Sequence, residues 1–246
     1  MIASIKKTAF HKEVYEPAED SFALVDALAA SLETWRRCPP RLCLEVGCGS
    51  GYVVCSLALL LRQAGAAAQL LATDVNPLAA AATAETLAAH EMLDRVDVVL
   101  TDLASSLLPS IAGLVDVLVF NPPYVPTPDE EVERGGIAAA WAGGERGRRV
   151  TDRLLPLVPA LLSPRGEMFL VAVHENDPRE LMRLMEAAGF EARVALQRSA
   201  DEERLTILHF RRRPDQAAEG EAAEVRTAGA AGAAAEDAAP RPGSDR

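Results

Sequence analysis

The sequence has few aromatic residues and few cysteines, and it contains no long apolar run. Its longest apolar stretch, Tyr52–Leu61, is much shorter than the roughly 20 residues that a membrane-spanning helix needs. The first residues lack the apolar core and the cleavage site of a signal peptide. These absences favour a cytoplasmic protein, with the nucleus as a second compartment.

The four cysteines, at positions 38, 43, 48 and 55, form no Cys-x-x-Cys pair and have no histidine nearby. This spacing suits neither a zinc site nor a disulfide framework, so we expect no metal site. Small buried thiols in a reducing compartment are the simplest interpretation. The sequence also lacks a phosphate-binding P-loop and the serine elbow of hydrolases, which argues against both of those enzyme classes.

Basic residues are too few to balance the acidic ones, and the net charge is −11. Residues 214–246 hold seven acidic and three basic residues, so residues 1–213 carry a net charge of −7. A protein this acidic is poorly suited to bind duplex DNA unaided, because that affinity comes mainly from neutralising phosphates. The last 33 residues have almost no large apolar side chains, so we expect residues 1–213 to form one domain and residues 214–246 to be a disordered tail.

Apolar runs with strand character alternate with helical patterns along the chain, which predicts a doubly wound, mostly parallel α/β sheet. Asp20 or Ser21 is expected to cap the first helix, and Asn76-Pro77 is expected to open an alanine-rich helix that runs to about His90. Pro164–Gly166 is expected to form a turn, and the prolines within residues 148–162 should break the helix there. The expected strands are Leu42–Val46, Gln69–Asp74, Val96–Thr101, Val115–Phe120, Met168–Val173, Ala192–Leu196 and Leu205–Phe210.

A glycine-rich loop follows the first expected strand, with the pattern Glu45-x-Gly47-x-Gly49-x-Gly51. Glycine lets the backbone approach a ligand closely and adopt positive φ. The dinucleotide pattern G-x-G-x-x-G fails, because Tyr52 stands where the third glycine should be. The spacing is instead that of a loop that binds S-adenosylmethionine.

Two further acids, Asp74 and Asp102, follow the next two expected strands. Asp74 is placed to accept hydrogen bonds from both hydroxyls of a ribose. Asp102 is placed to accept from an adenine amino group, while the Leu103 amide reaches a ring nitrogen. Because the carboxyl ends of parallel strands meet at one edge of a sheet, these residues and the glycine loop should converge on one ligand.

Asn121-Pro122-Pro123-Tyr124 follows a fully apolar strand pattern, and its two prolines turn the backbone out of the sheet. The turn suits a planar –NH2 group. Two acceptors, the Asn121 side-chain oxygen and the Pro122 carbonyl, would take its two N–H bonds, and Tyr124 would pack on its plane. Trp141 follows in an alanine-rich stretch, where packing in the core is the favoured interpretation.

With these residues in hand, the chain resembles the HemK-like family of class I methyltransferases, in its eukaryotic and archaeal branch. The most specific motifs are Val14–Asp20 (VYEPAED), Phe120–Val125 (FNPPYV), Gly136–Gly144 (GIAAAWAGG) and Leu157–Gly166 (LVPALLSPRG). The resemblance runs from about Phe10 to Arg212. It implies a seven-stranded Rossmann-like sheet with an antiparallel last strand. It also implies methylation of the glutamine in the Gly-Gly-Gln motif of class-one translation release factors.

The resemblance further implies which residues bind the cofactor and the substrate. S-adenosylmethionine would contact Ser21, Glu45, Gly47, Gly49, Asp74, Asp102, Leu103 and Asn121. Catalysis would involve Asn121, Pro122 and Tyr124, and the substrate would be bound by Asn121, Pro123 and Tyr124. Members of this branch work with a small zinc-binding activator protein at the sheet edge, and the alternating strand Val96–Leu100 is the edge candidate. The helical docking domain that precedes the bacterial enzymes is not found, which favours the partner-dependent branch.

The expected reaction is direct transfer of a methyl group from the sulfonium to an amide nitrogen, with the amide held in place and no general base. Asn121→Ala should slow turnover, whereas Asp74→Ala should mainly weaken cofactor binding. Other readings stay open at this point. They are an adenine N6 methyltransferase on DNA, a methyltransferase for protein lysine or a small molecule, and an inactive cofactor-binding subunit. The negative charge and the lack of a target-recognition region count against the DNA enzyme.

Overall fold

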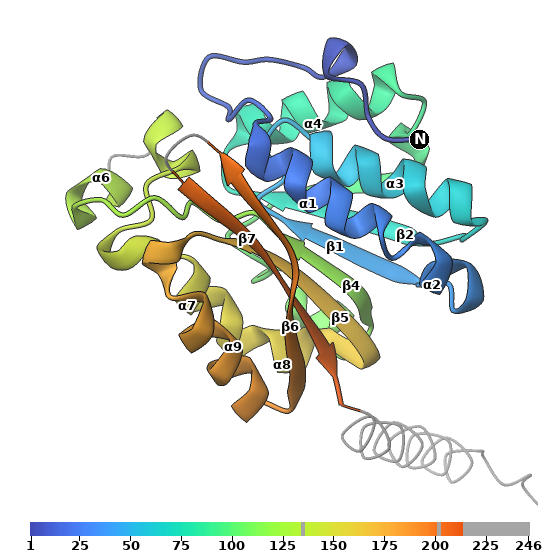
Figure 1. The fold of residues 1–246 in the computed structure, drawn as a ribbon. Helices are drawn as coiled ribbons and strands as arrows, with labels where there is room; N and C mark the ends of the chain where they lie inside the picture. The colour runs from blue at the N-terminus through green and yellow to red at the C-terminus, as the bar shows by residue number, and fades with distance from the viewer. Residues whose placement is uncertain (134–135, 201–202, 214–246) are drawn as a thin grey trace, which may run out of the picture.

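The computed structural model describes residues 1–133, 136–200 and 203–213. They contain a seven-stranded sheet of order β3-β2-β1-β4-β5-β7-β6 (Figure 1). Strands β1 to β5 pair in parallel, and β7 runs antiparallel to both of its neighbours, so the predicted fold class is confirmed. The predicted tail of residues 214–246 lies outside the described residues, so the division of the chain into domain and tail stays a prediction.

All seven expected strands are present, and the last three are longer than expected. Leu162 and the residues after it already belong to β5, so the turn predicted at Pro164–Gly166 is wrong. The pairing of β4 with β5 shifts register between Val115 and Val117 instead. A Cβ on Gly166 would come within 2.8 Å of the Val115 carbonyl oxygen, so the irregularity needs glycine there. The strands are β1 Leu42–Val46, β2 Gln69–Asp74, β3 Val96–Leu100, β4 Val115–Phe120, β5 Leu162–Ala172, β6 Phe190–Ala200 and β7 Glu203–Arg212.

Helices cover both faces of the sheet, as the fully buried β4 requires (Figure 1). One face is covered by α1 Glu19–Ala29, α2 Leu32–Arg37, α3 Tyr52–Ala64 and α4 Pro77–Ala89. The other is covered by α5 Leu108–Ile111, α7 Thr151–Leu154, α8 Val158–Leu161 and α9 Pro178–Ala187. Helix α6 is Asp129–Glu133, and the short 3-10 turns are Ile5–Lys7, Leu93–Arg95, Gly136–Ala140, Glu145–Gly147, Leu155–Leu157 and His174–Asn176.

The local signals for helix ends were only partly correct. Asn76 caps α4 as its sequence suggests, since its side chain accepts from the Leu78 amide. The prolines within residues 148–162 do break that helix into α7, a 3-10 turn and α8. The predicted cap of α1 is wrong, because the helix already begins at Glu19 and neither Asp20 nor Ser21 stands at its cap position.

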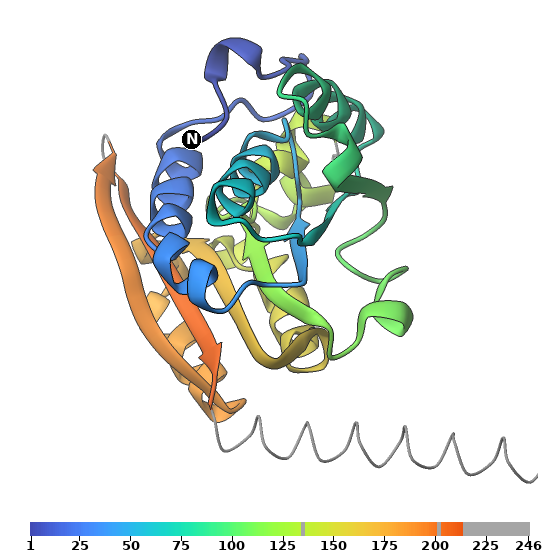
Figure 2. The same ribbon diagram turned by 90° about the vertical axis from the view of Figure 1, so that its right-hand side faces the viewer.

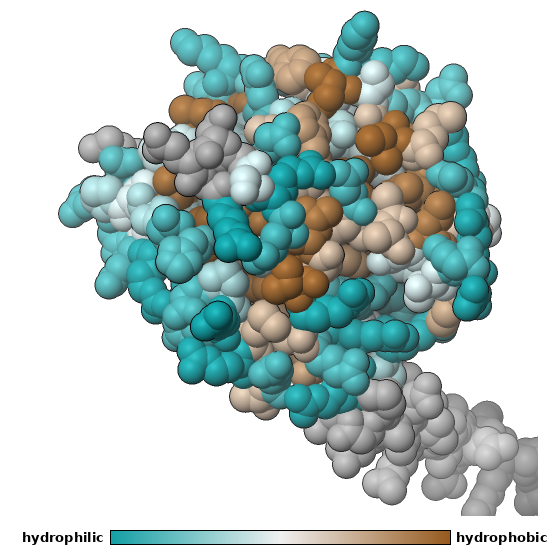
Figure 3. Space-filling model, viewed as in Figure 1, coloured by the Kyte–Doolittle hydropathy of each residue, from teal (hydrophilic) through white to brown (hydrophobic). Residues whose placement is uncertain are grey.

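The N-terminal arm and the two outer strands complete the surface. Residues 1–18 run over α3 and α4, where the amides of Ser4 and Ala9 donate to His90 Nε2 and Thr86 Oγ1 (Figures 1 and 2). Strands β3 and β6 form the edges of the sheet, as predicted for β3. Figure 3 shows hydrophobic side chains among hydrophilic ones where β6 and β7 cross this face. Within the described ranges, no helix has the length and hydrophobicity needed to span a bilayer.

The cysteines occupy the positions expected of structural thiols. Cys43, Cys48 and Cys55 are buried and Cys38 is exposed, and all four are free. Burial raises the pKa of the Cys55 thiol to about 12, so it stays protonated and unreactive at neutral pH.

Candidate active site

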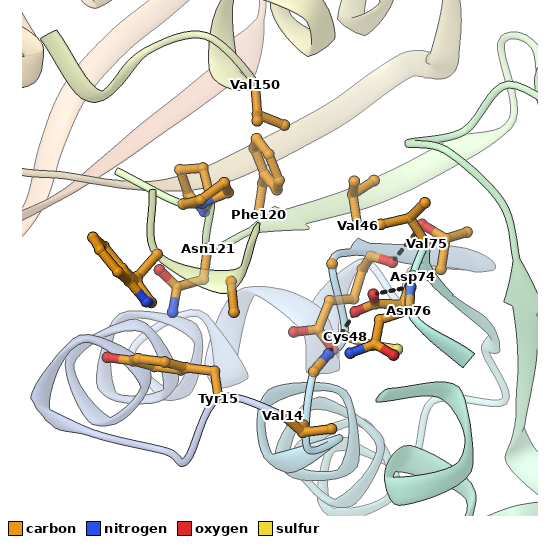
Figure 4. Close-up of a pocket in the computed structure, with 18 of the residues that line it drawn as sticks. Val14, Tyr15, Val46, Cys48, Asp74, Val75, Asn76, Phe120, Asn121 and Val150 are labelled. Atoms are coloured by element: carbon orange, nitrogen blue, oxygen red, sulfur yellow. Dashed lines mark hydrogen bonds between the residues drawn. The ribbon is translucent and has the colours of Figure 1, made fainter. Parts of the chain in front are cut away.

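A cavity of about 620 Å³ opens at the carboxyl ends of β1, β2 and β4. Figure 4 shows Asp74 and Asn76 at one end of it and Asn121 with Tyr15 at the other. The cavity brings together every site residue predicted from the sequence, although they come from five separate segments. These residues are Ser21, Glu45, Gly47, Gly49, Asp74, Asp102, Leu103, Asn121, Pro122, Pro123 and Tyr124.

The glycine loop and Asp74 form one rigid unit. The Gly49 amide donates to Asp74 Oδ2 (3.0 Å), and the Asn76 amide donates to Oδ1 (2.9 Å). A Cβ on Gly51 would come within 2.7 Å of Thr83 Cα, so the loop packs directly on α4. Burial raises the pKa of Asp74, and the backbone amides oppose that shift. A carboxylate offers about four acceptor positions, so Asp74 can still accept from a ribose hydroxyl.

Glu45 is the most deeply buried acid of the cavity, with 2% of its surface exposed. Its Oε2 has no hydrogen-bond partner among the described residues. Burial raises the pKa of this carboxyl well above its ordinary value, and the Val54 amide opposes the shift. A buried carboxylate oxygen without a donor is costly, so this atom favours a ligand that brings a donor or a positive charge.

We expect Glu45→Gln to stabilise the ligand-free protein while it weakens cofactor binding. Since the pKa is higher in the folded state than in the unfolded chain, the group takes up a proton on folding. The contribution of Glu45 to folding stability is therefore most favourable below the ordinary glutamate pKa. It is lost as the pH rises through the raised pKa, because the buried carboxyl must then ionise. Removing a penalty of roughly 1 kcal/mol would raise Tm by about 2–4 °C in a domain of this size.

Thermal unfolding at several pH values checks this expectation. The gain in Tm of Glu45→Gln over the wild type should grow with pH, whereas the same change at the exposed Glu186 should leave Tm unchanged. A variant that is less stable than the wild type at every pH would contradict the account.

Asn121 is oriented by a buried acid, Asp20, for which the sequence predicted only a helix cap. The Asn121 Nδ2 donates to Asp20 Oδ2 (3.0 Å), and the hydroxyls of Tyr15 and Tyr124 donate to the same oxygen (3.2 Å each). This leaves Asn121 Oδ1 buried and without a partner among the described residues. The amide oxygen at position 121 is thus available to accept from a ligand, and its role as the acceptor for a target amide stays a prediction.

Asp20 was missed because its local position suggests a helix cap. It is instead 3% exposed, and its second oxygen accepts from the Ser21 amide (2.6 Å) and the Ser21 hydroxyl (3.1 Å). The motif Val14–Asp20 could have indicated a functional role for Asp20. It is among the most specific motifs of the family resemblance, and a helix cap alone would not need so specific a sequence.

Asp102 and Leu103 line the cavity near its mouth. The Asp102 side chain is about half exposed and forms an ion pair with Arg153, another cavity residue that the sequence did not single out. This contact differs from the adenine contact predicted for Asp102, so a bound adenine would share the carboxylate with Arg153 or displace it. Leu103 has φ +53°, an uncommon conformation for leucine that often marks a binding site.

Trp141 does not lie in the core that the sequence favoured. It is half-buried and lines the cavity. Its carbonyl accepts from the Val125 amide (3.1 Å), and the Gly143 amide donates to the Val125 carbonyl (2.8 Å). The stretch 136–144 therefore packs beside the Asn121–Tyr124 turn and forms one wall of the site.

The sheet order and a cavity beside the glycine loop define a class I methyltransferase that uses S-adenosylmethionine. The residues present fit this cofactor, because Glu45 has an unpaired buried oxygen, backbone amides hold the Asp74 carboxylate at the cavity, and a Cβ on Gly49 would meet no atom within 4 Å. Comparisons with known proteins agree. Residues 20–135 match the model of the "Methyltransferase small domain" family.

The chain is 50% identical over 199 residues to "Methyltransferase HEMK2" of Mus musculus, which covers 81% of this chain and 90% of the mouse protein. It is 35% identical over 208 residues to "eRF1 methyltransferase catalytic subunit mtq2" of Schizosaccharomyces pombe, which covers 82% and 90%. The solved Mtq2–Trm112 complex of E. cuniculi superposes with a TM-score of 0.54 at 26% identity, covering 82% of this chain and 99% of that one. The chain belongs to the HemK-like methyltransferase family, in the branch of HEMK2.

Proposed function

We propose that this enzyme methylates the side-chain amide of the glutamine in the Gly-Gly-Gln motif of a class-one translation release factor. The observation that carries the proposal is the orientation of Asn121, whose oxygen is left without a partner while Asp20 binds its nitrogen. A site with a fixed, buried acceptor selects a ligand that presents N–H donors. The relative in Schizosaccharomyces pombe is named an eRF1 methyltransferase, which supports a release factor as the substrate.

Each residue of the turn has a defined task in this proposal. Asn121 Oδ1 and the Pro122 carbonyl accept the two N–H bonds of the target amide, and Tyr124 packs against its plane beside Pro123. When bound, S-adenosylmethionine supplies the electrophilic methyl group. The nitrogen lone pair of an amide is delocalised, so the chain must hold the amide close to the reacting geometry. The two oriented acceptors also stabilise positive charge that develops on that nitrogen.

Labelled methyl transfer tests the proposal directly. The enzyme, co-expressed with an activator protein, is given a release factor, the same factor with its Gly-Gly-Gln glutamine changed to alanine, and duplex DNA. Label on the wild-type factor alone is the expected result. Label on DNA and not on protein would instead support methylation of adenine in DNA. No label on any of the three substrates would contradict the release factor as the substrate.

We further propose that a small zinc-binding activator protein pairs with the edge strand β3, and that the complex works in the cytoplasm and the nucleus. The E. cuniculi relative was solved as an Mtq2–Trm112 complex, which supports a partner of this kind. Strand β3 is a free edge of the sheet, and Leu100 at its end is 57% exposed. Val75 and Leu93 are also exposed large apolar residues, on the segments that flank β3 in the sheet and in the chain. Exposed apolar edges of this kind need a cover.

Leu100→Glu is expected to weaken activator binding by about tenfold or more, because it places a charge where apolar area would be buried. The matched control is Leu184→Glu, since Leu184 on α9 is exposed to a similar degree but lies on another element. Pull-down and calorimetry with purified activator measure both variants. Equal binding by Leu100→Glu and the wild type would rule out β3 as the docking edge.

A further inference from the structure

Asn176 is a buried side chain whose amide nitrogen and amide oxygen both have hydrogen-bond partners, and it lies outside the cavity. It is 2% exposed and ends the 3-10 turn that follows β5. Its Nδ2 donates to the carbonyls of Tyr124 (2.8 Å), Arg146 (2.9 Å) and Gly147 (3.3 Å). Its Oδ1 accepts from the Val173 amide (2.8 Å). One side chain thus ties the end of β5 to two loops that border the active site.

The backbone around these carbonyls is tightly packed and strained. A Cβ on Gly147 would stand 1.8 Å from the Tyr124 carbonyl oxygen, and one on Gly143 would stand 2.5 Å from that of Pro123. Arg146 and Asp177 both have positive φ, at +57° and +51°. Such conformations persist only where the surroundings over-determine them, and they cluster at functional sites. The hydrogen bonds of Asn176 to the Arg146 and Gly147 carbonyls are part of that constraint.

The constraint acts on the residue that packs against the target amide. Asn176 binds the carbonyl of the peptide group that joins Tyr124 to Val125, and the amide of the same group donates to the Trp141 carbonyl, so this peptide is held at both ends. The Tyr124 hydroxyl donates to Asp20, which also binds Asn121. A displaced Tyr124 carbonyl would therefore move the ring of Tyr124 and disturb the acceptor at position 121.

We propose that Asn176 is a positioning residue for methyl transfer: by clamping the Tyr124 carbonyl to the 145–147 loop, it fixes the turn that holds the target amide. The proposal rests on the proposed function, since it assumes that the target amide binds at Asn121–Tyr124. It assigns no contact between Asn176 and cofactor or substrate. Removing the clamp should affect turnover and leave cofactor binding intact.

Two variants test the clamp. Asn176→Asp keeps the acceptor for the Val173 amide but places a carboxylate oxygen against three carbonyls, and Asn176→Ala removes the clamp without adding a charge. Both should lower kcat by about 10–100-fold, the loss expected when a reacting group shifts by about 1 Å. The KM for the release factor and the Kd for S-adenosylmethionine should stay within about threefold of wild type.

The matched control is Met185→Ala, which leaves a cavity under α9 and lowers stability without touching the turn. All proteins are assayed well below the lowest Tm. A similar loss of kcat in Met185→Ala, or an unchanged kcat in both Asn176 variants, would overturn the proposal. Asn176 would then contribute to the stability of the fold and not to methyl transfer.

Hydrogen exchange separates this proposal from the proposed function, because it needs no substrate. Both Asn176 variants should speed exchange at the Val125 and Thr127 amides, which bond to the neighbouring loop, while exchange in β1 and β2 stays as in wild type. Unchanged exchange at the Val125 and Thr127 amides would contradict the proposed role of Asn176, even if activity fell. Faster exchange in variants of a protein that methylates no release factor would support the positioning role of Asn176. It would contradict the release factor as the substrate.

Discussion

Asp20→Asn should lower kcat by about 10²–10³-fold, although it replaces a single oxygen by an NH2 group. The two oxygens of Asp20 accept from donors on both sides: Asn121, Tyr15 and Tyr124 on one, and the amide and hydroxyl of Ser21 on the other. Only a carboxylate accepts on both sides. An asparagine must turn its NH2 toward one of them.

The Ser21 backbone amide cannot reverse its role, so the new NH2 should face Asn121. The Asn121 side chain then flips to accept from it, and its own NH2 points into the cavity. The target amide would meet a donor where it needs an acceptor. The fold should tolerate this change, and the Kd for S-adenosylmethionine should stay within about threefold of wild type, because the end of the cavity at Asp74 is untouched.

A double variant makes this expectation specific. In Asp20→Asn with Asn121→Asp, the new carboxylate accepts from the new amide and still offers an oxygen to the substrate. We expect it to recover at least about tenfold of the turnover that Asp20→Asn loses, which single-turnover kinetics in a double-mutant cycle would measure. If Asp20→Asn retains turnover close to wild type, then Asp20 does not orient Asn121.

Asn121→Ala is the second change with a large expected effect. It removes the buried oxygen that accepts from the target amide, so turnover should fall by about 10²-fold or more. The Kd for S-adenosylmethionine should change little, because the glycine loop, Glu45 and Asp74 remain in place.

Asp74→Ala is the matched control for this experiment, and it should do the reverse. It removes a carboxylate that two backbone amides hold in place, so it should mainly weaken cofactor binding. Calorimetry with S-adenosylmethionine and single-turnover transfer at saturating cofactor separate the two effects. Loss of cofactor binding in Asn121→Ala would show that the two roles have been assigned wrongly.

The sequence by itself determined the architecture and the place of the site. Alternating apolar runs and helical patterns predicted all seven strands, because the spacing of apolar side chains is a local property of the sequence. The glycine loop, Asp74 and Asp102 were predicted to converge because each follows a strand of one parallel sheet. Asn76 was predicted to open α4, since a cap bonds within its own turn.

Only the tertiary structure decided which side chains work together. Asp20 has the local features of a helix cap, yet it binds Asn121, which lies 101 residues away in the sequence. Arg153 reaches Asp102 across 51 residues, and Asn176 reaches the Tyr124 carbonyl across 52. A buried polar group must find a partner, and that partner is set by how distant segments pack rather than by neighbours in the chain. The orientation of the Asn121 amide, on which the chemistry depends, is therefore a property of the folded protein.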